Sequence, residues 1–193
     1  MRSWTASWRS RRNALPGDDI WISGSPGDAA GALEQWRAGG AVDASLRARL
    51  DRPTPRVALG HALRGIANAC IDVSDGVLAD LGHVCAASGV GAEIELDLLP
   101  ASPALRGGFD PLALRHLQAS GGDDYELCFT AAPSARAAIE CLRSAGTPLA
   151  RIGRIVEHGG VEARDAAGAS WQPRRAGYQH FAPLQDGQDD EGH

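Results

Sequence analysis

Ile71-Asp72-Val73-Ser74-Asp75-Gly76-Val77-Leu78 is the stretch that decides the fold. Residues 70–73 are mostly apolar and predict a buried strand, and Ser74-Asp75-Gly76 predicts a turn. An amphipathic helix should follow, because apolar residues recur at helical spacing until Gly89 ends the pattern. Those residues are Val77, Leu78, Leu81, Val84 and Cys85. The stretch therefore predicts a strand that runs through a tight turn into a helix.

Two carboxylates and a hydroxyl gather at this turn. Asp72 and Ser74 are two positions apart and share one face of the strand, while Asp75 stands where the helix begins. Such oxygen groups suit a hard cation like Mg²⁺, which could hold the phosphates of a nucleotide. Two plainer interpretations stay open. Asp75 could cap the helix, and Asp72 could pair with a buried arginine such as Arg56 or Arg64.

The rest of the chain alternates irregularly between strands and helices. Strands are expected at residues 19–23, 92–96, 125–130, 150–156 and 161–164, with the last two forming a hairpin around residues 158–160. Helices are expected at residues 28–37, 44–50, 56–67, 112–119 and 134–144, with Asp28 and Ser134 as caps. This order predicts an α+β fold, in which helices pack on a layered, mixed β-sheet.

The stretch from Ser120 to Phe129, SGGDDYELCF, is the second candidate for chemistry. Its glycines allow the backbone to approach a neighbour closely, and three acids follow within four residues. Such like charges repel unless a cation is present, and a cationic substrate ring is one candidate partner. The competing interpretation is a tight turn before a strand, with Asp123 and Asp124 in water.

Two further motifs are weaker. Gly24-Ser-Pro-Gly-Asp28 could place backbone N–H groups against a phosphate, although it lacks the GxxxxGK[ST] pattern. Ala176-Gly-Tyr-Gln-His-Phe181 could close a pocket over a ring, or could simply anchor the C-terminal segment.

Composition bounds the class of protein. The formal net charge of −5 argues against a large basic surface for nucleic acid. The four cysteines form no CxxC pair and indicate reduced thiols rather than a zinc site or disulfides. No apolar run approaches a membrane span, and the first residues lack the apolar part of a signal peptide. A cytoplasmic protein is expected, with an irregular segment at residues 1–12, one domain at 13–184 and a disordered acidic tail at 185–193.

Taken together, these stretches resemble thiamine-monophosphate kinases, in order from Arg11 to Phe181. The resemblance is carried by GDDIWISGSPGD, RPTPRVALGHALRG, ACIDVSDGVLADLGHVCAASGVGAEIEL, SGGDDYELCFT, ARIGRI and GYQHF. The long IDVSDG–ADLGH block, followed by SGGDDYEL, is the most specific part. The fold that the resemblance implies is the C-terminal domain shared with aminoimidazole-ribonucleotide synthetase-like enzymes.

The resemblance also implies an activity and a set of site residues. The family uses ATP and Mg²⁺ to phosphorylate thiamine monophosphate to thiamine diphosphate. The positions that match the family's functional residues are Asp72 and Asp75 for magnesium, Ser74 and Arg11 for ATP, and Asp123 and Tyr178 for the substrate. No side chain is assigned a catalytic role.

The chain also departs from the family, because it begins after the N-terminal domain. That domain carries further magnesium ligands, nucleotide and substrate contacts, and most of the interface of a homodimer. The chain alone is therefore expected to fold at least partly but to have negligible kinase activity. Two alternatives stay open: another ATP-using member of the superfamily, such as a selenophosphate synthetase or hydrogenase-maturation relative, or a non-catalytic remnant that binds a ligand or partner.

Overall fold

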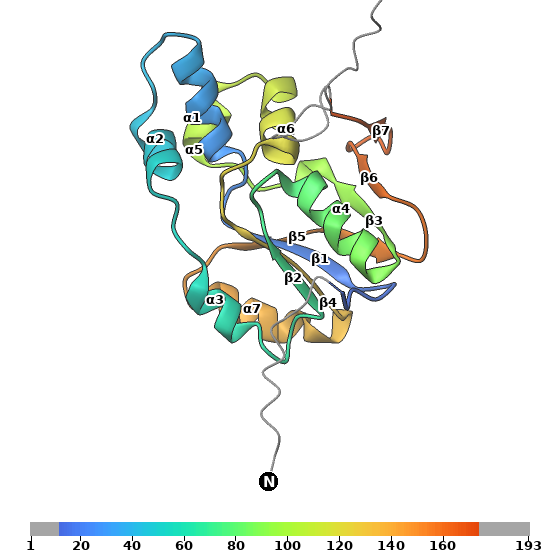
Figure 1. Ribbon diagram of the computed structural model, residues 1–193. Helices are drawn as coiled ribbons and strands as arrows, with labels where there is room; N and C mark the ends of the chain where they lie inside the picture. The colour runs from blue at the N-terminus through green and yellow to red at the C-terminus, as the bar shows by residue number, and fades with distance from the viewer. Residues whose placement is uncertain (1–11, 174–193) are drawn as a thin grey trace, which may run out of the picture.

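A computed structural model of the chain describes residues 12–173, in which one seven-stranded sheet forms the centre (Figure 1). The strands are β1 (Asp19–Ser23), β2 (Ala69–Asp72), β3 (Gly91–Glu95), β4 (Leu127–Ala131), β5 (Leu149–Val156), β6 (Val161–Arg164) and β7 (Ser170–Trp171). Their order across the sheet is β2-β4-β1-β5-β3-β6-β7. Neighbouring strands are antiparallel except for β3 and β6, which are parallel. The predicted α+β fold with a mixed sheet is confirmed.

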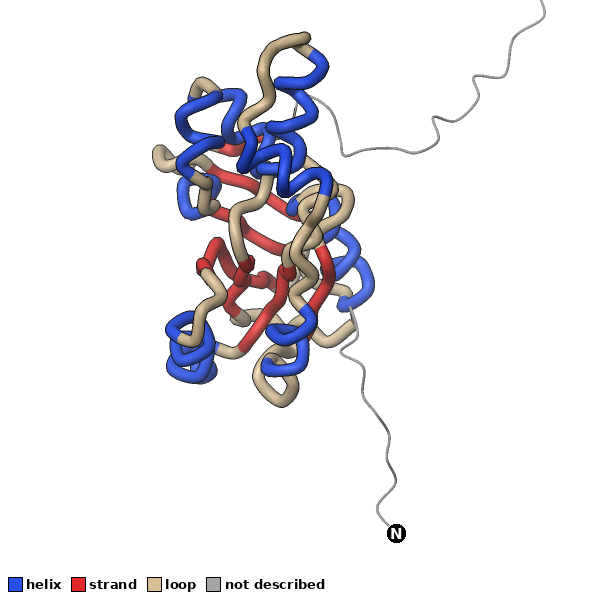
Figure 2. The backbone as a smooth tube through the Cα atoms, turned by 90° about the vertical axis from the view of Figure 1, so that its left-hand side faces the viewer, coloured by secondary structure: helices blue, strands red, loops and turns tan. Residues whose placement is uncertain are grey.

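Helices cover the sheet in distinct groups (Figures 1 and 2). The α-helices are α1 (Asp28–Arg37), α2 (Ala44–Asp51), α3 (Val57–Ala62), α4 (Val77–Ser88), α5 (Pro103–Gly108), α6 (Pro111–Ser120) and α7 (Arg136–Ser144), with 3₁₀ turns η1 (Leu96–Leu98) and η2 (Pro133–Ala135). Helix α4 packs on one face of the sheet, and α3 and α7 pack on the other. Helices α1, α2, α5 and α6 gather beyond one end of the central strands. In the part of the chain that is described, no helix has both the length and the hydropathy needed to span a membrane.

The central strand β1 is buried along its whole length because both faces of the sheet are covered. Ile20 and Ile22 belong to the cluster that packs against α4. Trp21 points the other way and stacks on Phe129 of β4, with ring centroids 6.4 Å apart. Each fully buried side chain of this size contributes roughly 1.5–3 kcal/mol, so the two clusters fix how α4, α3 and α7 sit on the sheet.

A third, smaller cluster holds the helical layer together. Ala32 of α1, Leu46 of α2 and Leu105 of α5 are fully buried against one another. Gly31 permits this packing, because a Cβ there would lie 2.6 Å from Leu105 Cδ1. The layer places α1 and α6 next to the end of β2, where the turn at residues 74–76 begins.

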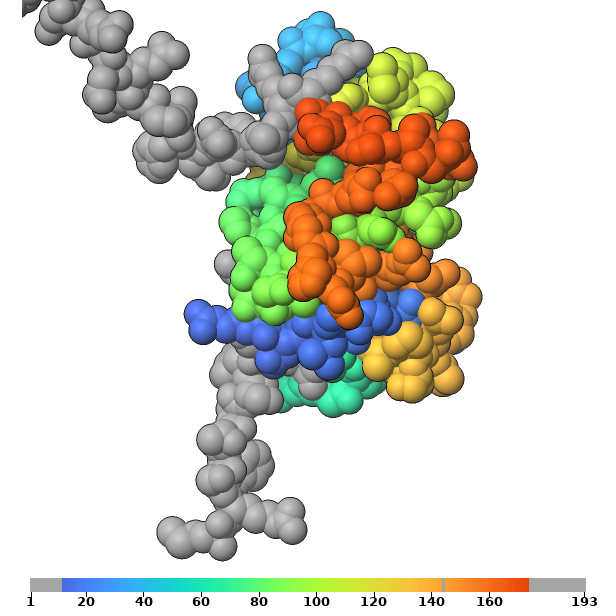
Figure 3. Space-filling view, turned by 90° about the vertical axis from the view of Figure 1, so that its right-hand side faces the viewer, coloured from blue at the N-terminus to red at the C-terminus, as the bar shows by residue number. Residues whose placement is uncertain are grey.

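The predicted strand–turn–helix is confirmed, and Gly89 ends α4 with a left-handed φ of 70°. The predicted hairpin of β5 and β6 is wrong, because β3 lies between these strands and pairs with both. The β5–β6 connection passes over the start of β3, where a Cβ at Gly91 would collide with the His158 carbonyl. Figure 3 shows β6 and β7, in orange and red, on the surface of this side of the molecule.

Several local predictions are also corrected. Asp28 does not cap α1; it lies inside the first turn and accepts a hydrogen bond of 2.7 Å from Ser102 Oγ. Ser134 does not cap α7, which begins after the 3₁₀ turn η2. The strand expected from Tyr125 starts only at Leu127, and α3 ends five residues before the expected limit of 67. Of the four cysteines, Cys85 and Cys128 are buried, Cys70 is half-buried and Cys141 is exposed.

Candidate functional site

Two turns that are far apart in sequence meet beside the end of β2. The SDG turn (residues 74–76) follows β2, and the acidic loop (residues 121–126) connects α6 to β4. Asp123 N donates to Ser74 O at 2.9 Å, and Tyr125 N donates to Val73 O at 2.9 Å. These backbone bonds fix the two motifs against each other.

Glycines make this close approach possible. A Cβ at Gly76 would lie 2.8 Å from the Ser120 carbonyl carbon, and Gly76 has a φ of 110°. A Cβ at Gly122 would collide with the Ser74 carbonyl oxygen. The glycines of both motifs are therefore required by their mutual contact, which the sequence showed only as two separate turns.

A pocket of about 910 Å³ opens above the two turns. One side is formed by α1 and another by α6, and the turns contribute the polar groups. Its lining residues are Ala29, Ala30, Leu33, Glu34, Arg37, Leu50, Ser74, Asp75, Phe109, Ala113, His116, Leu117, Ser120, Gly121, Gly122, Asp123 and Tyr125. Ala29 and Leu33 of α1 line the pocket, whereas Trp36 of the same helix is exposed.

Side chains of the acidic loop alternate between solvent and interior. Asp123 and Tyr125 are exposed and line the pocket, whereas Asp124 and Glu126 are buried. The expectation that both Asp123 and Asp124 lie in water is therefore wrong for Asp124. Asp123 and Tyr125 have φ values of 65° and 51°, a left-handed conformation that is uncommon outside glycine. With this backbone, Asp123 and Tyr125 point to the pocket, whereas Asp124 and Glu126 point into the interior.

Asp124 ties the acidic loop to the start of α1. Its carboxylate accepts hydrogen bonds from Gly27 N at 2.6 Å and from Ala29 N at 3.3 Å. These are N–H groups that the first turn of a helix leaves without an internal partner. Burial nevertheless raises the pKa of Asp124 to about 7, because desolvation outweighs the two hydrogen bonds and the nearby Arg49.

Glu126 is the deepest charge in the site, with no exposed surface. Arg49 Nη2 lies 2.6 Å from its carboxylate, and Arg56 donates from Nε and Nη2, each at 2.6 Å. Ser23 Oγ of β1 donates to the same carboxylate. Arg56, one of the partners suggested for Asp72, is thus engaged by Glu126, and this hydrogen bond raises the pKa of the Arg56 guanidinium.

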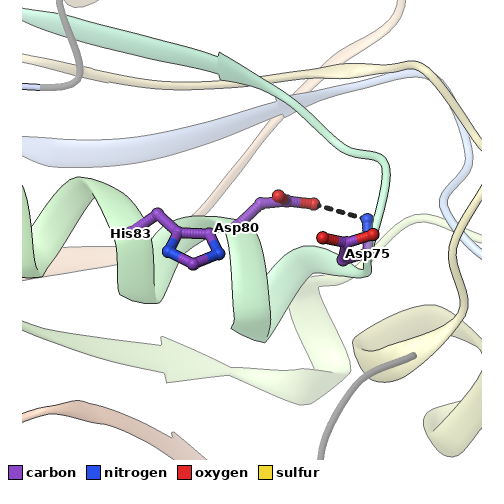
Figure 4. Close-up of side chains that lie close together, drawn as sticks. All are labelled: Asp75, Asp80 and His83. Carbon is purple, nitrogen blue, oxygen red and sulfur yellow. Dashed lines mark hydrogen bonds between the residues drawn. The ribbon is translucent and has the colours of Figure 1, made fainter. Parts of the chain in front are cut away.

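A second group, of two acids and a histidine, lies close together at the SDG turn and the helix that follows it (Figure 4). Potential ligand atoms of Asp75, Asp80 and His83 lie within 4.8 Å of one another. Asp80 is buried, and its Oδ2 accepts from Ser74 N and Asp75 N, both at 2.9 Å. Desolvation raises the pKa of Asp80. Asp80 thus satisfies the backbone of the turn, and Asp75 both belongs to this group and lines the pocket.

The structure places the predicted site residues as follows. Ser74, Asp75 and Asp123 come together at the pocket. Asp72 is exposed at the end of β2 and lies outside the group of three, and Asp75 does not cap α4, whose N-cap is Gly76. Arg11 and Tyr178 lie outside the described residues.

Sequence reasoning missed Asp80 and Tyr125 at the site, and it did not recognise Asp124 and Glu126 as buried anchors. The spacing of Asp80 and His83 on one helical face was a usable signal, because residues three apart on a helix are neighbours. Nothing in the local sequence indicates the burial of Glu126, because its partners Ser23, Arg49 and Arg56 come from three other elements.

Comparison with known proteins shows the family of the chain. A family model described as AIR synthase related protein, C-terminal domain, matches residues 16–166. The thiamine-monophosphate kinase of Escherichia coli (strain K12) is 41% identical over 183 residues, which are 90% of this chain and 55% of that relative. The chain spans about half the length of the curated relatives it matches.

Solved structures give the same result. The crystal structure of thiamine-monophosphate kinase from Stenotrophomonas maltophilia K279a has a TM-score of 0.77 and 50% identity, and the match covers 80% of this chain and 52% of that one. A structure described as AaThiL complexed with AMPPCP and TMP has a TM-score of 0.75 and 30% identity, covering 90% of this chain and 54% of that one.

Proposed function

This chain belongs to the AIR synthase related protein family, and from that premise we propose that it forms the C-terminal part of a thiamine-monophosphate kinase. The observation that carries the proposal is the pocket in which the SDG turn and the acidic loop meet. Relatives about 40% identical over most of this chain are named thiamine-monophosphate kinases. The proposal includes a cytoplasmic enzyme that acts as a homodimer when the family's N-terminal domain is present.

The proposed reaction transfers the γ-phosphoryl group of ATP to the phosphate of thiamine monophosphate. A phosphate oxygen of thiamine monophosphate attacks the γ-phosphorus, the bond to the β-phosphate oxygen breaks, and ADP leaves as thiamine diphosphate forms. The protein needs to hold both reactants in line and to offset their negative charges. This explains why acids line a pocket for phosphates: a divalent cation is required between them.

Asp72 and Asp75 are the proposed magnesium ligands. Mg²⁺ prefers oxygen ligands and retains several waters, so two carboxylates near one turn fit its chemistry. Asp75 lies on the pocket, and its backbone is held by Asp80. His83 offers a nitrogen atom, which suits Mg²⁺ less well, so we assign it no magnesium contact.

Asp123 and Ser74 are proposed to contact thiamine monophosphate and ATP, respectively. Their backbones are joined by the bond from Asp123 N to Ser74 O, so the two reactants would meet at this junction. Ser120 lines the same pocket, and its buried Oγ has no hydrogen-bond partner among residues 12–173. A buried hydroxyl without a protein partner is expected to find one in an ordered water or in a ligand group that reaches it.

Tyr178 is proposed to join Asp123 at the substrate, and Arg11 is proposed to contact ATP. The Trp171 ring of β7 lies 4.8 Å from that of His116, a pocket residue. Tyr178 follows Trp171 by seven positions, and seven extended residues span up to about 23 Å. The chain is therefore long enough for Tyr178 to reach the pocket.

The test is calorimetric titration of the full 193-residue chain with thiamine monophosphate and, separately, with magnesium and AMPPCP. We expect Asp123→Asn to weaken thiamine monophosphate binding about tenfold, because a hydrogen bond to a charged group is worth about 1.5–3 kcal/mol. Asp75→Asn should instead weaken the magnesium-dependent nucleotide binding. Asp97→Asn, an exposed acid paired with Arg115, is the matched control and should change neither.

Failure of the unaltered chain to bind either ligand would contradict the proposal. An assay for thiamine diphosphate, with ATP and excess magnesium, then separates transfer from binding alone. Formation of product would reject a non-catalytic remnant. A preference for a substrate other than thiamine monophosphate would favour another ATP-using member of the superfamily.

A further inference from the structure

We infer that the ring of Tyr125 is a ligand-contacting wall of the pocket, and that it selects ligands carrying a flat ring. The inference rests on the proposed function only in the choice of thiamine monophosphate as the first ligand to test. It starts from three properties that Tyr125 combines. Tyr125 is an aromatic residue with 42% of its surface exposed, it lines the pocket, and its φ is 51°.

The backbone of Tyr125 is costly for a residue with a side chain. A left-handed conformation disfavours an L-residue by roughly 1–2 kcal/mol, whereas glycine adopts it freely. Among the described residues, Asp123 and Tyr125 are the two positive-φ positions that are not glycine. Nearby turns use glycine for this purpose, as at Gly27 and Gly76. Residues with a strained backbone cluster at functional sites, so the side chain of Tyr125 is a candidate for a function.

Packing of the fold does not account for the ring. A side chain this exposed contributes little to a core, and Tyr125 belongs to none of the buried clusters of residues 12–173. Glycine at position 125 would keep the bond from the backbone N–H to Val73 O and would remove the strain. Folding alone would therefore favour glycine, so the ring must act at the pocket surface.

Buried anchors on both sides hold Tyr125 in this conformation. Before it, Asp124 accepts from Gly27 N and Ala29 N, and the Asp124 carbonyl accepts from Arg49 Nη2 at 3.3 Å. After it, Glu126 is fixed by Arg49, Arg56 and Ser23. Because both neighbours of Tyr125 are held by several bonds, the backbone at Tyr125 is fixed before a ligand binds. A fixed backbone lowers the entropy cost of binding.

The surroundings define the chemistry of the ligand. Apolar side chains from α1 and α6, including Leu33 and Leu117, share the pocket with Tyr125. Asp123 stands two residues away in the same loop, and the lining carries three acids against one arginine. Aromatic faces attract flat rings, and they attract cationic rings most. The pocket thus favours a neutral or positively charged ring over an anionic one.

The experiment compares Tyr125→Gly and Tyr125→Phe with Leu112→Ala in the full chain. Leu112 is 46% exposed on α6 and does not line the pocket, so it is a matched loss of exposed apolar surface. Calorimetry would follow thiamine monophosphate, thiamine and AMP, and thermal denaturation would follow stability. We expect Tyr125→Gly to weaken ring binding by about tenfold or more, and Tyr125→Phe to stay within about threefold.

The thermal stability of Tyr125→Gly should not fall together with its ligand binding. Tyr125→Gly should keep or raise the melting temperature because the strain is relieved, a combination that a merely structural tyrosine would not produce. Unchanged binding in Tyr125→Gly, or loss of binding together with a lower melting temperature, would overturn the inference. If the unaltered chain binds AMP but not thiamine monophosphate, the proposed function fails while Tyr125 is still tested on AMP. If it binds none of the three compounds, the inference fails as well.

Discussion

The SDG turn and the acidic loop lie against each other but are stabilised in different ways. The SDG turn places its positive φ at Gly76, and Asp80, five and six residues away, accepts its two N–H groups. The acidic loop places positive φ at Asp123 and Tyr125, and the partners of its buried carboxylates are 70 to 103 residues away. The first turn is thus stabilised locally and without strain, whereas the second is strained and depends on the rest of the fold.

The two turns therefore depend on different parts of the molecule. In the SDG turn, Asp80 of the helix that follows holds the backbone of Asp75 in place. The conformation of the acidic loop, which presents Asp123 and Tyr125, depends instead on contacts from four distant elements: β1, α1, α2 and the start of α3. Four experiments would break or sharpen the contrast.

The largest effect is expected from Glu126→Ala, which removes the long-range anchor. Two arginines would be left partly buried without their partner, and breaking a buried charge pair in this way costs about 3–5 kcal/mol. The free energy of unfolding from urea denaturation is the measurement. Asp97→Ala, which breaks an exposed pair with Arg115, should cost less than about 1 kcal/mol. Equal losses in the two variants would show that Glu126 is not an anchor.

The second effect is a pH dependence that belongs to Asp124. Its pKa rises from 3.8 to about 7 on folding, so the unfolded chain loses this proton first. The associated stability is complete below about pH 4 and falls as the pH rises toward 7. Between pH 5 and 8 the unaltered chain should lose about 2–3 kcal/mol that Asp124→Asn does not lose. Urea denaturation at several pH values measures both curves, and parallel curves would refute the assignment.

The third experiment pushes the two turns apart. In Gly122→Ala the new methyl group would meet the Ser74 carbonyl, and such overpacking costs about 1–3 kcal/mol. Gly107→Ala is the control, because it lies in α5 with no atom within 4 Å of the new Cβ. The control should be neutral or stabilising by up to about 1 kcal/mol. A Gly122→Ala variant as stable as Gly107→Ala would mean that the contact is not tight.

The smallest effect is expected at the locally held turn. Asp80→Ala leaves Ser74 N and Asp75 N without their acceptor and should cost about 1–2 kcal/mol. His83→Ala, the exposed member of the same group, should change the free energy of unfolding by less than about 0.5 kcal/mol. If Asp80→Ala proved as costly as Glu126→Ala, the contrast between local and long-range anchoring would be lost.

The sequence by itself determined the strand–turn–helix at residues 69–88, because its information is local. Apolar spacing defines α4, and Gly76 and Gly89 mark its two ends. The quoted motifs also identified the family resemblance and three residues that line the pocket: Ser74, Asp75 and Asp123. These predictions needed only side chains within a few positions of one another.

Only the tertiary structure decided how the acidic loop is built and where β3 lies. The burial of Asp124 and Glu126 depends on Gly27, Arg49 and Arg56, and no local pattern indicates those partners. The insertion of β3 between β5 and β6 similarly depends on pairing with both neighbours. In the sequence, the acids of residues 123–126 look like solvated side chains. In the structure, two of them are buried, because arginines and helix N–H groups from distant elements compensate their charge.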